Sequence, residues 1–99
     1  MAMDDDELMR RSAEGDSSAF EEIVRRHQQA VWGIAWRYFR DADEAEDVAQ
    51  DTFLRLLEAA PQYRPKAALS AYIRKIAVRL CLDRSRRKKP IYVAELPER

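Results

Sequence analysis

One segment of the chain places acidic side chains and a leucine at spacings of three and four residues. The set is Asp47, Gln50, Asp51 and Leu54. Residues at i, i+3, i+4 and i+7 lie on one face of an α-helix, so this set, called the acidic strip below, would form one surface. The strip could dock on a basic partner helix, with Leu54 as the apolar anchor and the carboxylates setting its orientation. A solvated acidic face has the same spacing, because single exposed leucines are ordinary, so both interpretations stay open.

The opposite charge gathers in the last part of the chain. The sequence holds 18 basic and 18 acidic side chains, but residues 1–60 carry a net charge of −8 and residues 61–99 a net charge of +8. Such asymmetry suggests two different partners. Residues 61–90 combine ten lysines and arginines with a single aspartate, and a surface with this excess attracts phosphates.

Two tyrosines lie among these basic residues, where aromatic rings could stack on unpaired bases. Tyr72 falls on the inward phase of its segment, which favours a core position for that ring alone. For the cluster as a whole we favour nucleic acid as the partner. The residues expected to bind it are Tyr63, Arg64, Lys66, Tyr72, Arg74, Lys75, Arg79 and Arg86.

The residue types used in catalysis and metal binding are isolated in this sequence. His27 is the single histidine and falls on an apolar phase, where a hydrogen-bonded interior role is commoner than a catalytic one. Glu44, Asp47 and Asp51 resemble part of a metal site, but no histidine or cysteine joins them. Cys81 is expected to be a small apolar filler. We therefore expect a protein that is not an enzyme and holds neither a metal nor a cofactor.

Helices must position these surfaces. With 99 residues, 46% apolar side chains, two glycines and four prolines, the composition predicts one all-α domain, a compact bundle of about four helices. Residues 1–90 would form the domain, and residues 91–99 an extended tail that begins a linker. Helices are expected over residues 4–14, 17–39, 43–60 and 69–90.

Particular residues should begin and end these helices. Gly15 is expected to end the first helix, and Asp16 or Ser17 to cap the second. Asp43, with Glu46 three residues on, resembles a capping box that opens the third helix. Prolines at positions 61 and 90 should stop the third and fourth helices, leaving a connector of about six residues between them.

Apolar residues at helical spacing predict the core. The second helix should turn inward Phe20, Ile23, Val24, His27, Val31, Ile34, Ala35 and Tyr38. The third should bury Ala45, Val48, Ala49, Thr52, Phe53, Leu56 and Leu57. The fourth should bury Leu69, Tyr72, Ile73, Ile76, Ala77, Leu80 and Cys81.

The sequence also favours a cytoplasmic location. A single cysteine cannot form an internal disulfide, so nothing indicates an oxidising compartment. Residues 1–7 are acidic where a signal peptide needs basic and then apolar residues. No apolar run approaches the roughly 20 residues that span a bilayer, so we expect no membrane association.

Three stretches of the sequence resemble a known family. They are DEAEDVAQDTFLRLL at residues 43–57, AFEEIVRRHQQAVWGIAWRYFR at residues 19–40 and YIRKIAVRLCLDRSRR at residues 72–87. Together they resemble region two of the extracytoplasmic-function (ECF) sigma factors of the sigma-70 family, and the resemblance extends from Asp4 to about Lys89. The chain departs from the common pattern at Tyr72, Arg79 and Pro65, where relatives often have Trp, Asn and Gly.

The resemblance implies a domain that docks on core RNA polymerase and recognises and melts the promoter minus-ten element. The acidic strip would then contact the clamp helices of the polymerase β′ subunit. The loop at residues 63–68 and the basic half would hold the opened non-template strand, with one base flipped into a pocket. The resemblance also implies an anti-sigma factor as a partner. Relatives continue into region four, a helix-turn-helix that reads the minus-thirty-five element, so we expect a truncated domain.

Two other functions compete with this interpretation. A helical adaptor, such as an anti-sigma factor, could use the acidic strip for protein partners without any specific DNA contact. A duplex-binding helix-turn-helix is less favoured, because no short turn joins two helices of the recognition type.

Overall fold

The computed structural model describes the backbone of residues 3–95 and the side chains of residues 3–87. Four α-helices form the chain: α1 (Asp5–Ala13), α2 (Ser17–Phe39), α3 (Ala42–Ala59) and α4 (Leu69–Glu95), with a short 3-10 turn at Ala60–Gln62. Residues 3–95 contain no strand, so the predicted all-α fold of four helices is confirmed. None of the described helices combines the length and the apolar character needed to cross a membrane.

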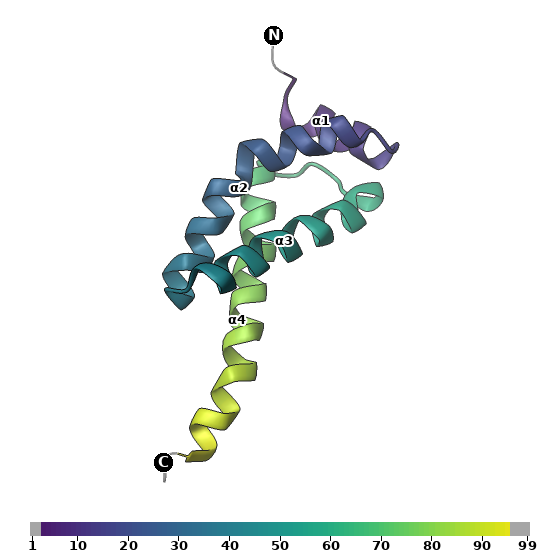
Figure 1. Ribbon diagram of the computed structural model, residues 1–99. Coiled ribbons are helices and arrows are strands. Elements are labelled where there is room, and N and C mark those ends of the chain that lie inside the picture. The colour runs from purple at the N-terminus through teal and green to yellow at the C-terminus, as the bar shows by residue number, and fades with distance from the viewer. Residues whose placement is uncertain (1–2, 96–99) are drawn as a thin grey trace.

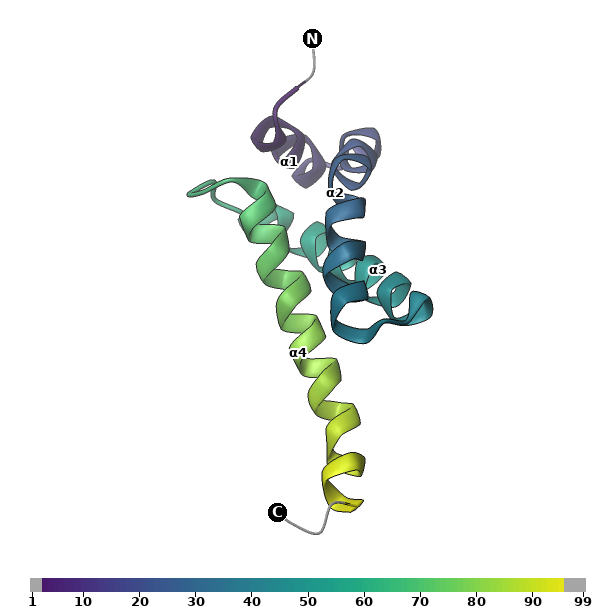
Figure 2. The ribbon, with the colours of Figure 1, turned by 90° about the vertical axis from the view of Figure 1, so that its left-hand side faces the viewer.

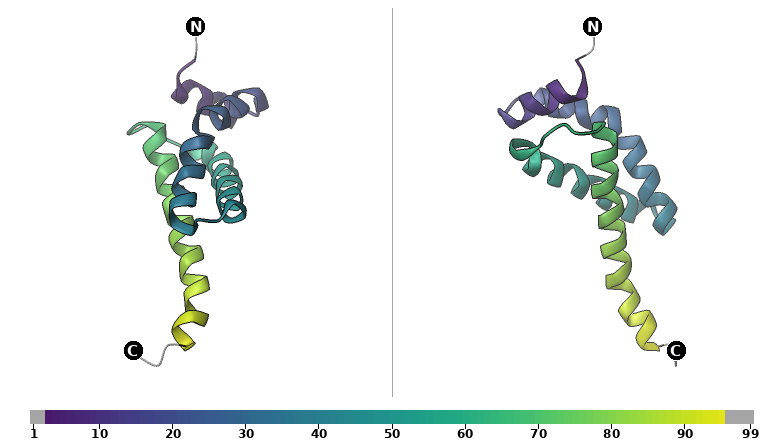
Figure 3. Two further views of the ribbon diagram at one scale, coloured as in Figure 1. Left: turned by 60° about the vertical axis from the view of Figure 1, so that its left-hand side comes forward. Right: turned by 180° about the vertical axis from the view of Figure 1, so that it is seen from behind.

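Helix α2 is the centre of the arrangement, because it contacts α1, α3 and α4. Figure 1 shows α1 lying across one end of the bundle, with α2 and α3 running in opposite directions beside it. Turned by 90°, Figure 2 shows α4 alongside α2, with the loop that precedes α4 close to α1. The last turns of α4 extend past the other helices in both views of Figure 3.

The turn between α1 and α2 depends on glycine. Gly15 has a φ of +97°, a conformation that side chains with a Cβ rarely adopt. Asp16 then accepts hydrogen bonds from the amides of Ser18 and Ala19 and caps α2. The predicted roles of Gly15 and Asp16 are confirmed.

The turn between α2 and α3 differs from the prediction by two residues. Arg40 adopts the left-handed conformation, with φ 52° and ψ 39°, and its amide donates to the Trp36 carbonyl. Asp41 follows in an extended conformation and accepts hydrogen bonds from the amides of Asp43 and Glu44 at 2.8 and 3.1 Å. The cap of α3 is therefore Asp41, and the expected capping role of Asp43 is wrong, because Asp43 already lies in the first turn.

Helix α4 also differs from the prediction at its end. It continues past Pro90 to Glu95, where the sequence analysis placed a stop at the proline and an extended tail beyond it. A proline removes a single amide donor and disfavours helical geometry in the residue before it, but neither effect forbids continuation of a long helix. Residues 96–99 of the expected tail lie outside the described residues.

The core contains most of the residues that helical periodicity assigned to it. One cluster joins all four helices and includes Leu8, Met9, Ile23, Val31, Phe53, Leu56, Leu69 and Ile73. A second cluster joins α2, α3 and α4 through Ala35, Ala45, Val48, Leu80 and Cys81. Trp32 packs against this second cluster and stacks on Trp36, with ring centroids 5.6 Å apart and planes 7° from parallel. Trp36 itself is partly exposed.

Two residues assigned to the core are exposed. Tyr38 is 43% exposed and Leu57 is 41% exposed. The inward positions at the end of α2 step through Val31, Ala35 and Phe39, so Tyr38 lies about 100° to the side. In α3, Leu56 takes the inward position and turns its neighbour Leu57 toward solvent.

We predict that Phe53→Ala lowers the free energy of unfolding by about 3 kcal/mol or more, because the ring is buried in the cluster that joins all four helices. Leu57→Ala is the matched control on the same helix and should cost about 0.5 kcal/mol or less. Urea denaturation of both variants measures the difference. Equal losses would contradict this prediction, because they would show that Leu57 is buried in the core, as helical periodicity alone suggests.

Candidate functional site

The acidic strip lies on the outward face of α3. Asp47, Gln50 and Leu54 are exposed, and Leu54 is 61% exposed, the highest value among the large apolar side chains that the structure describes. Asp51 is half-buried and accepts a hydrogen bond from the Nε of Arg55 at 3.1 Å. The four residues of the strip therefore share one surface, as their spacing predicts.

An apolar groove runs beside the strip, between α2 and α3. Its volume is about 410 Å³, and Gln50 and Leu54 of the strip form part of its edge. Its walls are completed by Phe20, Val24, Gln28, Glu46, Ala49 and Phe53. The sequence analysis missed this groove, because the α2 residues that form one of its walls come close to the strip only when α2 and α3 pack together.

The basic residues of α4 point away from the core. Arg74, Lys75, Arg79 and Arg86 are exposed, while their neighbours Ile73, Ala77 and Leu80 are buried. Asp83 moderates the charge, because it lies 3.6 Å from the Nε of Arg79 and 3.5 Å from a terminal nitrogen of Arg86. We call Arg74, Lys75, Arg79 and Arg86 the basic face below.

Arg84 differs from its basic neighbours. Its guanidinium lies 3.2 Å from a carboxylate oxygen of Glu44, and both side chains are largely buried between α3 and α4. This ion pair links the two helices across the second core cluster. Arg84 is therefore a structural residue, although a count of the basic side chains of α4 would include it in the binding surface.

Tyr63 and Tyr72 pack on one another, with ring centroids 5.1 Å apart and planes at 61°. Both rings also pack against the core, so the core position favoured for Tyr72 is confirmed in part. The Tyr63 hydroxyl is buried and has no hydrogen-bond partner among the described residues. Burial, with smaller contributions from Asp6, Tyr72 and Asp5, raises the pKa of this hydroxyl, which therefore stays protonated at neutral pH.

Tyr72 also reaches a groove of about 490 Å³ between α3 and α4. Lys75 and Arg79 line the same groove, so three of the residues expected to bind nucleic acid come together there. Arg55 and Glu58 form part of the facing wall on α3. The α4 wall, which also contains Asp83 beside Arg79, combines an aromatic ring with two cations. Such a wall can stack on a base and contact the phosphate of the same nucleotide.

The loop before α4 is exposed at Arg64, Pro65 and Lys66. Arg64 donates a hydrogen bond to the carbonyl of Tyr63 at 3.2 Å. Pro65 and Lys66 share a shallow pocket with Asp4–Asp6 at the start of α1. The acidic beginning of the chain thus faces the basic loop, a proximity that the sequence analysis did not predict.

His27 and Cys81 have structural surroundings. The Nε2 of His27 lies 3.0 Å from a carboxylate oxygen of Asp5, and Arg26 contacts the other oxygen of the same carboxylate. The hydrogen-bonded interior role predicted for His27 is therefore confirmed. Cys81 is fully buried, and burial raises the pKa of its thiol. Among the residues that the structure describes, no cluster of histidine, cysteine and carboxylate side chains could hold a metal ion.

The sequence of this chain is similar to those of known proteins. Residues 23–91 match the family described as Sigma-70 region 2. The ECF RNA polymerase sigma factor SigM of Mycobacterium tuberculosis is 35% identical over 94 residues, which are 95% of this chain and 48% of that protein. The ECF RNA polymerase sigma factor SigW of Bacillus subtilis is 33% identical over 78 residues, which are 79% of this chain and 42% of that protein.

The RNA polymerase sigma-H factor of Pseudomonas aeruginosa is 34% identical over 74 residues, which are 75% of this chain and 38% of that protein. The chain thus spans less than half the length of these curated relatives. The family match covers more than two-thirds of the chain and includes all of α3 and most of α2 and α4. The chain belongs to the sigma-70 region 2 family.

Proposed function

We propose that this chain is the domain of an ECF sigma factor that docks on core RNA polymerase and recognises and melts the promoter minus-ten element. The observation that supports this proposal most is the separation of two charged surfaces onto different helices. The acidic strip lies on α3 and the basic face on α4. A domain that holds DNA against a second protein needs two such surfaces, and neither docking nor strand separation requires a catalytic group.

The acidic strip fits a basic helical partner. Exposed carboxylates and an exposed leucine border a groove with apolar walls, so a partner helix could place an apolar side chain in the groove and basic side chains on the strip. By the family resemblance this partner is the pair of clamp helices of the β′ subunit. An anti-sigma factor that covered the same surface would block docking.

The basic face and the groove at Tyr72 fit single-stranded DNA. Exposed cations along α4 would neutralise successive phosphates, and the groove combines an aromatic ring with Lys75 and Arg79. The exposed loop residues Arg64, Pro65 and Lys66 lie at the start of the same helix, where they could enclose a flipped base. The loop would then read base identity, while the helix supplies affinity.

We predict that Asp51→Arg and Leu54→Ala each lower the affinity for core polymerase at least about tenfold. The first change places like charges together, and the second removes an apolar anchor worth roughly 1 to 2 kcal/mol or more. Thermal unfolding of the isolated chain should barely change, because Leu54 is exposed and Asp51 pairs with an exposed arginine of the same helix, a kind of pair that contributes little to stability.

Glu14→Arg is the control for this experiment, since it makes the same charge reversal at an exposed acidic residue that, like Asp51, pairs with an arginine four residues away, here at the C-cap of α1. Polymerase pull-down and a melting curve are measured for all three variants. Wild-type binding by both strip variants would refute the docking assignment. Binding that is lost only in step with the melting temperature would show that the strip is part of the core.

We predict that binding of single-stranded minus-ten DNA depends on salt with a slope of about −2 to −3 in log affinity against log salt. The basic face would neutralise three or four phosphates at about 0.7 per phosphate. Replacing Arg74, Lys75, Arg79 and Arg86 one after another by alanine should reduce the slope in steps. A slope near zero for the unaltered chain would favour the helical adaptor, which needs no phosphate contact.

We predict that exchanging residues 64–68 for the loop of another family member changes which minus-ten base is preferred. The exchange leaves Tyr63 in place, because its ring packs against the core and against Tyr72. Helix content and polymerase affinity should stay as they are, since the exchanged residues are exposed. Competition between oligonucleotides that differ at single bases measures the preference. An unchanged preference would move base recognition to α4, with Arg79 the next residue to test.

A further inference from the structure

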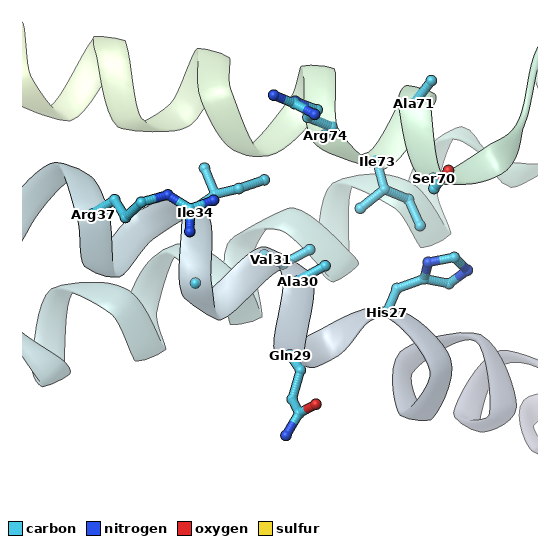
Figure 4. A pocket seen from close by; sticks show the side chains of 11 residues that line it. His27, Gln29, Ala30, Val31, Ile34, Arg37, Ser70, Ala71, Ile73 and Arg74 are labelled. Atoms are coloured by element: carbon cyan, nitrogen blue, oxygen red, sulfur yellow. The ribbon is translucent and has the colours of Figure 1, made fainter.

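The start of α4 borders two hollows of different charge. On the side of α2 lies a groove of about 410 Å³, with Arg37 and Arg74 on its two walls (Figure 4) and no carboxylate among its lining residues. On the side of α1 lies the pocket of about 490 Å³ that Pro65 and Lys66 share with Asp4–Asp6. Figure 2 shows the loop and the start of α1 at the same end of the molecule. Negative charge therefore lies beside the basic loop rather than in the groove.

Two of these three aspartates are free to act on the loop. Asp5 is engaged by α2, because its two carboxylate oxygens lie 3.0 Å from Arg26 and 3.0 Å from His27. Asp4 and Asp6 are exposed, and neither forms an ion pair with any residue that the structure describes. Their charge is therefore not neutralised by a neighbouring side chain.

The backbone holds these two aspartates in place beside the loop. Asp4 caps α1 by accepting a hydrogen bond from the amide of Glu7 at 2.9 Å, and Asp6 belongs to the first turn. Met3 packs against the core cluster that joins all four helices, which anchors the segment before the cap. Lys66 is exposed, and within the described part of the chain it has no ion-pair partner. The carboxylates thus stay near Lys66 without binding it.

Charges that line one pocket act on one another through space. The pKa of the Tyr63 hydroxyl, at the start of the loop, is raised first by burial and next by the charge of Asp6. The same negative charge lowers the positive potential around Lys66 and repels a phosphate that approaches it. Two carboxylates about 10 Å from one phosphate in water weaken its binding about fourfold before salt screens them.

We propose that Asp4 and Asp6 form an electrostatic screen that weakens DNA binding at the loop of residues 63–68. The inference rests on the proposed function, because the screen opposes the phosphates that the loop and the basic face attract. The loop alone then holds a phosphate weakly, and a strand stays bound through the cations of α4. The screen is an autoinhibitory contact built into the start of the chain.

Asp4→Asn together with Asp6→Asn removes the screen, and asparagine keeps the cap because its side-chain oxygen accepts the same hydrogen bond. The probe is a labelled, mixed-sequence single-stranded oligonucleotide of about twelve nucleotides. The double variant should bind it about two- to fourfold more tightly than the unaltered chain at about 50 mM salt. The gain should be smaller at about 200 mM salt, where the Debye length is shorter. Asp6→Asn alone leaves the cap untouched and should give part of the gain.

Asp41→Asn together with Asp43→Asn is the matched control. Asp41 caps α3 as Asp4 caps α1, and Asp43 has the same position in its helix as Asp6. Both double variants therefore change the same residue types and raise the net charge by the same amount. Neither control aspartate lines the loop pocket or the groove at Tyr72, so the control should bind like the unaltered chain. Melting curves check that both double variants fold.

Equal affinities of the two double variants would overturn the proposal, whether both gained or neither did. Combined with Lys66→Ala, the Asp4 and Asp6 changes should gain less, because the loop then draws no phosphate toward the screen. An undiminished gain would show that the carboxylates act elsewhere than at the loop. If Lys66→Ala weakens binding but the screen variants bind like the control, the screen fails while the proposed function stands. If neither the unaltered chain nor any variant binds the oligonucleotide, both fail.

Discussion

The tight turn at Arg40 and Asp41 is the constraint on which the surfaces of this domain depend. Two residues reverse the chain: one in the left-handed conformation, and one extended and capping the next helix. The reversal returns α3 against α2 and fixes which face of α3 is buried. Once Val48, Phe53 and Leu56 enter the core, the acidic strip must face outward and the groove beside α2 must form. A different turn length would rotate the strip away from that groove.

The charges of the two halves are kept apart by packing rather than by distance along the chain. α3 and α4 touch along their buried faces, so their charged faces point in different directions. Where opposite charges do meet between these helices, at Arg84 and Glu44, they form a largely buried pair and are removed from the binding surfaces. The net neutrality of the chain therefore hides a dipolar domain, with its negative and its positive charge on separate faces.

Helical periodicity predicts most of this fold because each helix buries a single stripe. It identifies the acidic strip and the outward position of Arg74, Lys75, Arg79 and Arg86, since these follow from the phase of one helix. It misplaces Tyr38 and Leu57, which each lie one position beside the buried stripe near the end of a helix. It also selects Asp43 over Asp41, because both precede the same apolar run and the choice depends on Arg40.

The grooves could not be predicted in this way. Each has walls from two helices, and Arg37 and Arg74 become neighbours only after α2 and α4 pack. The same holds for Tyr63, whose position against Tyr72 depends on the path of the loop. Sequence spacing describes one helix at a time, whereas these grooves lie between two.

The stacked tryptophans carry an optical consequence. Trp32 and Trp36 are the two tryptophans of the chain, and both lie in the last turns of α2. Their nearly parallel rings are held together by a single helical turn, so their electronic transitions couple while that turn exists and uncouple when it frays. The intrinsic fluorescence and circular dichroism of the indoles therefore report on one place, the end of α2 beside the turn that sets the position of α3.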